Sequence, residues 1–460
     1  MSSFDFLSIL KIIVHCACFL NSFIGCAVSS EKNTSNDSLK LQHIHVLFRH
    51  GDRTPLVDPI NKDVPFITTW PLGAGQLTEK GILQEYELGQ WLRKKYEDFI
   101  PEKYNGSDFH MRSTDVDRTL MSAQCVSAGV FHNSSSPLQP FGINWRPIPV
   151  HTVSQEADVL LSVAPCPFLD VLRDLEMKSE AAIQTENNHS ALFELVNRNL
   201  DMKVDRYNLW KVSDTLTCME AHDMQFPDWC SEQVYKELIE VETFYWNLIF
   251  TSSTEILRLE IGVFLSAFVD HVTSVIDNTC SPIIKGPLSV QHILAYSAHD
   301  TDVSYLLAAL GVFDHHLVEY SAAVVLELLG PDPPAPSYNY RLRVLYKRGY
   351  PDDTGEYRVL PPCHNESGED GCPLDRVLRY LEPFLLKPEE HNIVCTVTQD
   401  IKDKRAISRF IANFIPSYLM YTLLGVSLAL CLIVGVSANM FCRWRHHRSD
   451  MRFKQLLTSA

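Results

Sequence analysis

The sequence predicts an α/β fold, in which a mixed sheet is flanked by helices and a mostly helical subdomain is inserted at about residues 168–275. Strand-like apolar runs alternate with stretches of helical spacing before and after that region, which is typical of a sheet covered by helices. The inserted region repeats apolar residues at helical intervals and contains few strand signals. The whole chain of 460 residues is 46% hydrophobic and 21% charged, which is the composition of a folded protein.

The N-terminal segment has the features of a secretory signal peptide. Residues 6–28 are apolar with one lysine and end in small residues, so we expect residues 1–28 to be removed near Ala27 or Ser29. The weak positive charge before this run leaves an uncleaved membrane anchor as the alternative. Residues 29–40 are polar and predict a flexible start to the mature chain.

The elements of the folded domain follow in order. Before the inserted region, the patterns predict a strand at 41–48 and a helix at 76–96. Residues 109–129 then predict a short strand that leads through a turn into a second helix. Thr78 is the predicted N-cap of the first helix. After the inserted region, the patterns predict a strand at 291–297 and a helix at 302–310. They also predict a hairpin whose two strands are residues 322–329 and 338–349.

A second long apolar segment predicts a membrane span near the C-terminus. No charged residue occurs between Arg409 and Arg443, and the 24 residues at 418–441 suffice to cross a hydrocarbon layer of about 30 Å. Residues 442–460 would be a cytoplasmic tail and residues 41–400 an extracellular or lumenal domain, which is a type I topology. Six N-x-S/T sequons upstream of the span agree with this orientation: Asn33, Asn36, Asn105, Asn133, Asn188 and Asn365.

Cysteine usage and charge narrow the class of protein. Eight of the 13 cysteines lie between the signal peptide and the span, an even number that suits an oxidising compartment. Cys363 and Cys372 bracket a turn-rich loop that a local bridge could close, and no CxxC pair suggests a metal site instead. The formal charge of −16 argues against binding of nucleic acid.

Charged residues follow three of the predicted strands. Arg49 and His50 follow the first, Arg112 ends the second, and His299 and Asp300 follow the third. In open α/β sheets, ligands bind beyond the carboxyl ends of the strands. We therefore expect these side chains to converge on one site.

The residue types at these ends suit phosphoryl transfer. Arg49, Arg53 and Arg112 would bind phosphate oxygens through their planar guanidiniums. His50, kept neutral by its cationic neighbours, would attack phosphorus. His299 would add a donor, and Asp300 would protonate the leaving oxygen. The arginines supply the positive charge, so we expect neither a metal nor a cofactor in this site.

The motifs resemble those of the histidine acid phosphatases. LFRHGDRTP, SAHDTD, MRSTDVDRT and INWRPIPVHTV are similar to segments of that family, over roughly residues 40–395. The resemblance implies that His50 is the phosphorylated histidine, that Asp300 is the proton donor, and that the segment 111–119 holds the third phosphate-binding arginine. It also implies hydrolysis of phosphate monoesters, with small molecules or phosphoproteins as substrates, and suggests a homodimer. Among family members, the terminal span is most like that of the membrane-anchored lysosomal and testicular forms.

The resemblance further implies disulfides between Cys166 and Cys395 and between Cys363 and Cys372. It leaves Cys218 unpaired, because the position of its usual partner has an alanine near 322 or 323. Cys230 is then a substitute partner, with Cys125 and Cys280 unpaired or bonded to each other. No tyrosine follows Tyr421, so the tail lacks a tyrosine-based sorting signal, and lysosomal and cell-surface membranes both stay open.

Two other functions compete with this prediction. A phytase-like inositol polyphosphate phosphatase would need more cations than the acidic domain suggests, and the HDTD sequence at 299–302 also favours the general phosphatase. A non-catalytic adhesion or receptor domain would be expected to lack one of the chemical residues, and all six are present. Hydrolysis at the outer or lumenal side of a membrane is therefore the main hypothesis.

Overall fold

A computed structural model describes residues 39–61, 63–161, 164–279 and 292–395. The predicted signal peptide, membrane span and tail lie outside the described residues, and so does Cys280. Within the described part, one helix, α10 (Thr254–Ile276), is long and apolar enough to cross a membrane. Of its apolar window, 72% is buried inside the fold, so it has the burial of a core helix.

The fold is built on one mixed sheet, as the sequence predicts. In the part of the chain that the structure describes, this sheet has eight strands. Their order is β3-β2-β4-β1-β5-β6-β7, and β8 pairs with β6 beside that path. Strands β3, β2, β4 and β1 are parallel, whereas β5 to β8 pair antiparallel. The bounds are β1 (Lys40–Arg49), β2 (Phe109–Ser113), β3 (Val150–His151), β4 (Ile293–Ala298), β5 (Ala323–Gly330), β6 (Arg341–Lys347), β7 (Glu356–Arg358) and β8 (Cys372–Pro373).

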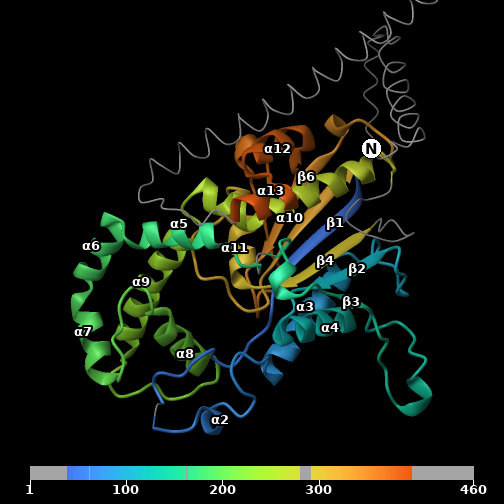
Figure 1. The fold of residues 1–460 in the computed structure, drawn as a ribbon. Helices are drawn as coiled ribbons and strands as arrows, with labels where there is room; N and C mark the ends of the chain where they lie inside the picture. Colours follow the sequence, from blue (N-terminus) through green and yellow to red (C-terminus); the bar gives the residue numbers. More distant parts are fainter. Residues whose placement is uncertain (1–38, 62, 162–163, 280–291, 396–460) are drawn as a thin grey trace, which may run out of the picture. The chain divides into compact units, whose positions relative to one another are not determined.

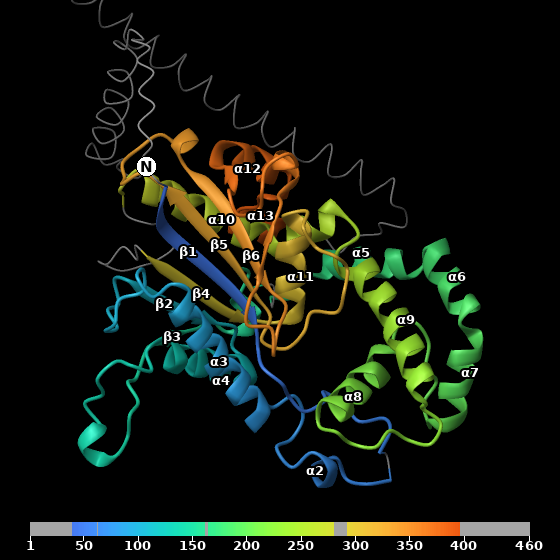
Figure 2. The ribbon, with the colours of Figure 1, turned by 180° about the vertical axis from the view of Figure 1, so that it is seen from behind.

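Helices cover both faces of the sheet (Figures 1 and 2). Ile44, Val46 and Phe48 of β1 point to one face, where they pack with α3 (Glu79–Lys95) and α4 (Asp117–Val130). Leu47 points to the other face, which α10, α11 (Asp300–Ala309) and α12 (Leu374–Leu381) cover. Alternate side chains of a strand face opposite sides, so the central strand is buried on both. Thr78 is the N-cap of α3, as predicted, and its Oγ1 accepts from Gly81 N at 3.1 Å.

The helices of the middle region form a core of their own. Apolar residues from Met177 to Tyr245, together with Trp70, make one buried cluster apart from the sheet. Helix α10 differs, because its buried residues belong to the core over the sheet. Besides α10, the helices of the inserted region are α5 (Pro167–Met177), α6 (Glu180–Asn188), α7 (Ser190–Asn199), α8 (Trp210–Ala221) and α9 (Glu232–Phe250). Two further helices, α2 (Phe66–Thr69) and α13 (Pro388–Cys395), lie outside this region.

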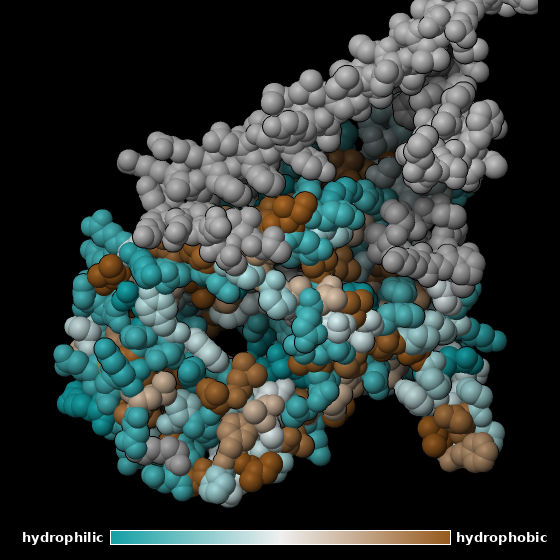
Figure 3. All heavy atoms as spheres, viewed as in Figure 1, coloured by the Kyte–Doolittle hydropathy of each residue, from teal (hydrophilic) through white to brown (hydrophobic). Residues whose placement is uncertain are grey.

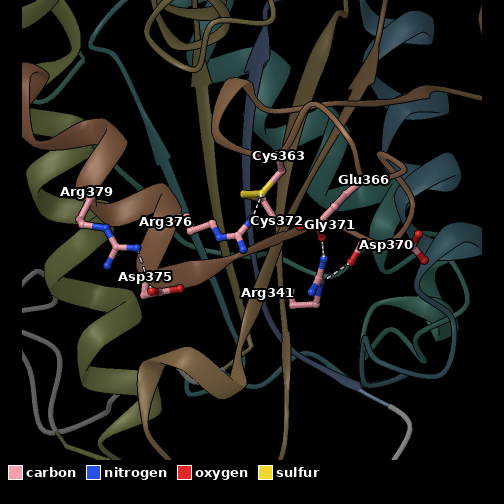
Figure 4. The surroundings of a disulfide bond; sticks show 9 residues. All are labelled: Arg341, Cys363, Glu366, Asp370, Gly371, Cys372, Asp375, Arg376 and Arg379. Carbon is pink, nitrogen blue, oxygen red and sulfur yellow. Dashed lines mark hydrogen bonds and ion pairs between the residues drawn. A yellow bond between two sulfur atoms is a disulfide. The ribbon is translucent and has the colours of Figure 1, made fainter.

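Within the described residues there are two disulfides, with the pairing that the family resemblance implies. Cys166–Cys395 ties the start of α5 to the end of α13. Cys363–Cys372 closes a loop beside β6 (Figure 4). There, the Arg341 guanidinium donates to the carbonyl oxygens of Asp370 and Gly371 and pairs with Glu366. The loop is therefore fixed by polar contacts as well as by the bridge.

The suggested pairing of Cys218 with Cys230 is wrong. Both are free, buried thiols, and Cys125 is a third free thiol. The Cys218 thiol lies instead 3.9 Å from Arg53 Nη1 and 3.7 Å from the Tyr320 hydroxyl. Its position on α8 points it toward the ends of the sheet strands, because Arg53 follows β1 and Tyr320 precedes β5.

Candidate active site

The end of β1 lies beside the end of β4. The two strands are parallel neighbours, and Arg49 is opposite Ala298 in their register. The next residues of each strand therefore leave the sheet side by side, and His50 N donates to the Ala298 carbonyl oxygen at 3.0 Å. This pairing brings Arg49 and His50 to the start of α11, where Asp300 is the first residue. Two of the three predicted strand ends thus converge.

The His50 side chain is held as a neutral imidazole with one free lone pair. It is buried, and its Nδ1 lies 2.8 Å from the Gly51 carbonyl oxygen. A carbonyl oxygen only accepts, so Nδ1 carries the proton and Nε2 has the lone pair. Burial lowers the pKa of His50 well below its usual value, and the positive charges of Arg118 and Arg49 lower it further. Nε2 is therefore available as a nucleophile at acid pH.

Arg49 is positioned by contacts on several sides. Its Nη2 lies 2.9 Å from Asp300 Oδ2, and Nη1 donates to the Val318 carbonyl oxygen. The guanidinium also stacks over the Tyr320 ring, 4.0 Å from its centroid. A guanidinium held in this way has lost most of its rotamer freedom before a ligand arrives, which favours binding. Sequence reasoning did not identify Tyr320 as part of the site.

Arg53 is fixed by a carboxylate from the helical part. Its Nη2 donates to Asp214 Oδ1 at 2.8 Å, and Asp214 Oδ2 accepts from Leu56 N at 2.9 Å. Burial alone would lower the pKa of Arg53, but Tyr320 and Asp214 outweigh it and raise that pKa. Helix α8, which carries Asp214, thereby contributes to a site otherwise made from the sheet. The sequence offered no motif around Asp214 that could have marked it.

A third arginine near His50 is Arg118, the second residue of α4. Its Nη2 lies 3.4 Å from His299 Nδ1, and its positive charge lowers the pKa of both His50 and His299. Burial and the nearby charge of Arg53 lower the pKa of Arg118 to about 10, so it stays charged at acid pH. The sequence contained a signal for Arg118, because this residue lies in the same motif, residues 111–119, as the predicted Arg112.

Arg112 itself is held elsewhere. Its Nη2 lies 2.7 Å from Asp158 Oδ1, a fully buried carboxylate. Strand β4 separates β2 from β1, and Arg112 is paired in register with Tyr296 of β4. The structure thus pairs Arg112 with Asp158, and the contact of Arg112 with phosphate stays a prediction.

His299 is oriented by both ring nitrogens. Nδ1 can only accept from the Arg118 guanidinium, so Nε2 carries the proton and faces Thr114 Oγ1 at 3.1 Å. Burial, followed by the charge of Arg118, lowers the pKa of His299 to about 3. His299 therefore stays neutral, and its proton is directed at Thr114. In this arrangement His299 positions Arg118, and its predicted contact with a ligand stays a prediction.

Asp300, the predicted proton donor, places a second carboxylate in the site. Its side chain is 22% exposed, and its Oδ1 accepts from Thr301 N at 2.9 Å. Burial alone would raise the pKa of Asp300, but the charges of Arg49 and Arg53 outweigh it, so that pKa is lowered. Without a ligand, Asp300 is ionised and serves as the counterion of Arg49.

The charges of the site suit a phosphate dianion. Three guanidiniums, those of Arg49, Arg53 and Arg118, face only two carboxylates, those of Asp214 and Asp300, and both histidines are neutral, so these groups carry a net positive charge. The space-filling view shows a hollow between helices α8 and α9 and this end of the sheet (Figure 3). Within the described residues, no group of side chains suited to a metal ion includes a residue of this site.

The chain is similar over most of its length to known phosphatases. A model of the histidine phosphatase superfamily (branch 2) matches residues 40–347. The chain is 34% identical to the lysosomal acid phosphatase of Homo sapiens over 380 residues, or 80% of this chain and 83% of that protein. It is 34% identical to the prostatic acid phosphatase of Bos taurus over 381 residues, or 79% and 90%. The apo phytase of Hafnia alvei shares the fold, with a TM-score of 0.57 at 16% identity over 79% of this chain and 99% of that one.

Proposed function

The chain belongs to branch 2 of the histidine phosphatase superfamily, and we propose that it is an acid phosphatase that hydrolyses phosphate monoesters through a phosphohistidine at His50. The observation that carries this proposal is the tautomer of His50. Its Nδ1 proton is committed to the Gly51 carbonyl oxygen, which leaves the Nε2 lone pair among three guanidiniums. A neutral nucleophile in a cationic site can attack a phosphate dianion at low pH.

The first half-reaction transfers the phosphoryl group to the enzyme. His50 Nε2 forms a bond to phosphorus as the bond from phosphorus to the ester oxygen breaks, and Asp300 gives its proton to the departing oxygen. The guanidiniums of Arg49, Arg53 and Arg118 stabilise the charge on the other phosphate oxygens. We place Arg118 in this role instead of Arg112, because Arg118 lies at His299 and its charge lowers the pKa of His50, whereas Arg112 pairs with Asp158.

The lowered pKa of Asp300 in the empty site is compatible with a proton donor. The same guanidiniums that lower this pKa would contact the phosphate, and the added negative charge would offset their effect. The pKa of Asp300 therefore rises when substrate binds, and acid pH supplies the proton. In the second half-reaction, the Asp300 carboxylate takes a proton from water, the water oxygen attacks phosphorus, and phosphate leaves as His50 is restored.

A rapid-quench experiment tests the covalent step. Purified protein is mixed with phosphate-labelled p-nitrophenyl phosphate and quenched in base within milliseconds. We expect a base-stable, acid-labile label on the wild type and none on His50→Ala. His364→Ala, at an exposed position outside the site, is the matched control and should be labelled fully. Equal labelling of His50→Ala would place the nucleophile elsewhere.

The phytase-like alternative is not favoured. The likeness to phytases shows the fold alone, and the site offers three guanidiniums, two of which already face carboxylates. A substrate with several phosphates would require further cations. Equal kcat/KM values for myo-inositol hexakisphosphate and p-nitrophenyl phosphate would support that alternative instead.

We propose for the intact chain a type I membrane protein, with this domain on the lumenal or extracellular side. The lysosomal acid phosphatases among its relatives and the apolar segment at 418–441 support this topology. Protection of the domain from added protease in sealed vesicles, lost on addition of detergent, would agree with it. Digestion of the domain in intact vesicles would contradict it.

A homodimer is the assembly that we propose. The loop around the short helix η1 (Gln139–Phe141) ends in a hydrophobic tip (Figure 3), where Phe141 is 78% exposed, Ile143 48% and Trp145 44%. Apolar side chains gathered on a protruding loop indicate a protein contact. Trp145→Glu should convert a dimer into a monomer in analytical ultracentrifugation, and a wild type that sediments as a monomer would refute the assembly.

A further inference from the structure

Three histidine side chains meet in the core, away from the proposed active site. His43 and His45 are two residues apart on β1 and so point to the same face of the sheet, and His271 of α10 packs against them. All three are buried, with at most 1% exposed. Their ring centroids are 4.5 to 5.2 Å apart, and one nitrogen from each lies within 4.8 Å of the other two.

Next to the cluster, this face of the sheet is apolar. Leu47 continues it along β1, and the ring of Phe268 lies 4.9 Å from that of His45. In the part of the chain that the structure describes, neither ring nitrogen of His45 has a hydrogen-bond partner. A buried polar group without a partner costs about 1–3 kcal/mol. An imidazole at this position is therefore unfavourable unless something binds it.

The chemistry of the cluster fits a transition-metal ion. A neutral imidazole is a strong ligand for zinc and copper, whereas calcium and magnesium require oxygen ligands. Three nitrogen donors without a thiolate or carboxylate make the set that a zinc ion binds with one position left for water.

We propose that His43, His45 and His271 form a buried site for one transition-metal ion, of which zinc is the best match. Bonds of about 2.0–2.1 Å to each nitrogen would require the three nitrogens to lie closer together than they do in the cluster, so the rings would have to turn toward the ion. The ion ties the central strand β1 to helix α10. It lies apart from the phosphate site, so this proposal and the proposed function stand independently.

Burial determines how such a site is filled. The three ligands are shielded from solvent, so the ion enters while the chain folds and leaves only when it unfolds. Metal binding then adds to the stability of the folded state, since the unfolded chain has no preformed site. Brief treatment with a chelator should leave the ion in place.

Elemental analysis of the purified full-length chain tests the proposal. After passage over a chelating resin, the wild type should retain about one equivalent of metal per chain. His45→Thr and His43→Phe should retain less than a tenth of that amount. His110→Phe is the matched control, because His110 stacks on His151 at 4.4 Å in another part of the sheet, and it should keep the full equivalent.

Refolding of the wild type covers the case in which the variants do not fold. The chain is unfolded with its disulfides intact in denaturant and chelator, and then refolded with zinc, with copper, or with neither. A melting temperature raised by several degrees with either metal supports the site. The proposal is overturned if the wild type carries no stoichiometric metal and refolds to the same melting temperature with and without the ions. Loss of the metal in His110→Phe as well would also overturn it.

Discussion

Replacing Arg118 by methionine should separate the proposed phosphate-binding arginine from its neighbour in the same motif. Arg118 lies 3.4 Å from His299 Nδ1, and its charge acts on His50. Arg112 pairs with Asp158 at 2.7 Å instead. Arg112→Met is therefore a matched control, since both variants lose one guanidinium and keep a side chain of similar length.

The two substitutions should differ in size and in kind. Removing one donor to a developing oxyanion typically costs about 10²- to 10³-fold in rate, so we expect a loss of that order in kcat/KM for Arg118→Met. After burial, Arg118 makes the largest contribution to the lowered pKa of His50. Its loss raises that pKa, and His50 becomes protonated at a higher pH. The acid side of the kcat/KM profile should move upward in pH accordingly.

Arg112→Met should change stability instead of catalysis. It leaves the Asp158 carboxylate, which is fully buried, without its partner, and breaking a buried pair costs about 3–5 kcal/mol. Burial already raises the pKa of Asp158, and the loss of Arg112 raises it further. A carboxyl whose pKa is raised in the folded state destabilises the protein above that pKa. The loss should therefore be larger at pH 7 than at pH 5.

Two measurements check this contrast. Hydrolysis of p-nitrophenyl phosphate from pH 3 to 7 gives kcat/KM for each variant, and urea unfolding at two pH values gives the free energy of unfolding. The assignment is refuted if Arg118→Met hydrolyses as fast as the wild type, or if Arg112→Met loses the same factor while its stability is unchanged.

Three further predictions follow from single contacts. Asp300→Asn should slow β-glycerophosphate far more than p-nitrophenyl phosphate, since a proton donor contributes about 10²- to 10⁴-fold where the leaving group needs it, and the difference should shrink as pH rises; equal slowing at every pH would contradict the role of Asp300. Replacing Cys166 and Cys395 by serine should cost about 2–5 kcal/mol, measured by urea unfolding, and an unchanged midpoint would show that the bridge adds no stability. Thr78→Ala should cost about 1 kcal/mol, because the Gly81 N–H loses its cap, and Thr78→Ser should restore most of it.

Much of the fold could be predicted because its elements are long enough to show a period. Apolar patterns that can be recognised in the sequence mark the strands β1, β4, β5 and β6 and the helices α3 and α11. The strands β3, β7 and β8 have only two or three residues, too few for a pattern, and their pairing is decided by the strands beside them. Helix α10 shares the helical spacing of the inserted region, yet it packs on the sheet. Most of its residues are buried, and a helix that is apolar all round belongs to a core.

The sequence alone does not decide which arginine of the segment 111–119, Arg112 or Arg118, faces the site. Strand periodicity turns the Arg112 side chain out of the sheet toward Asp158, whereas Arg118 depends on where the next helix begins. The sequence predicts only that this helix follows a strand and a turn within residues 109–129, and the helix begins at Asp117. In a helix, side chains lean toward its N-terminus, so an arginine in the first turn of α4 reaches back to the strand ends. A shift of two or three residues turns a side chain by more than half a turn around the helix axis. The motif therefore contains the arginine that we propose to bind phosphate, and the start of α4 at Asp117 is the observation on which we choose Arg118 over Arg112.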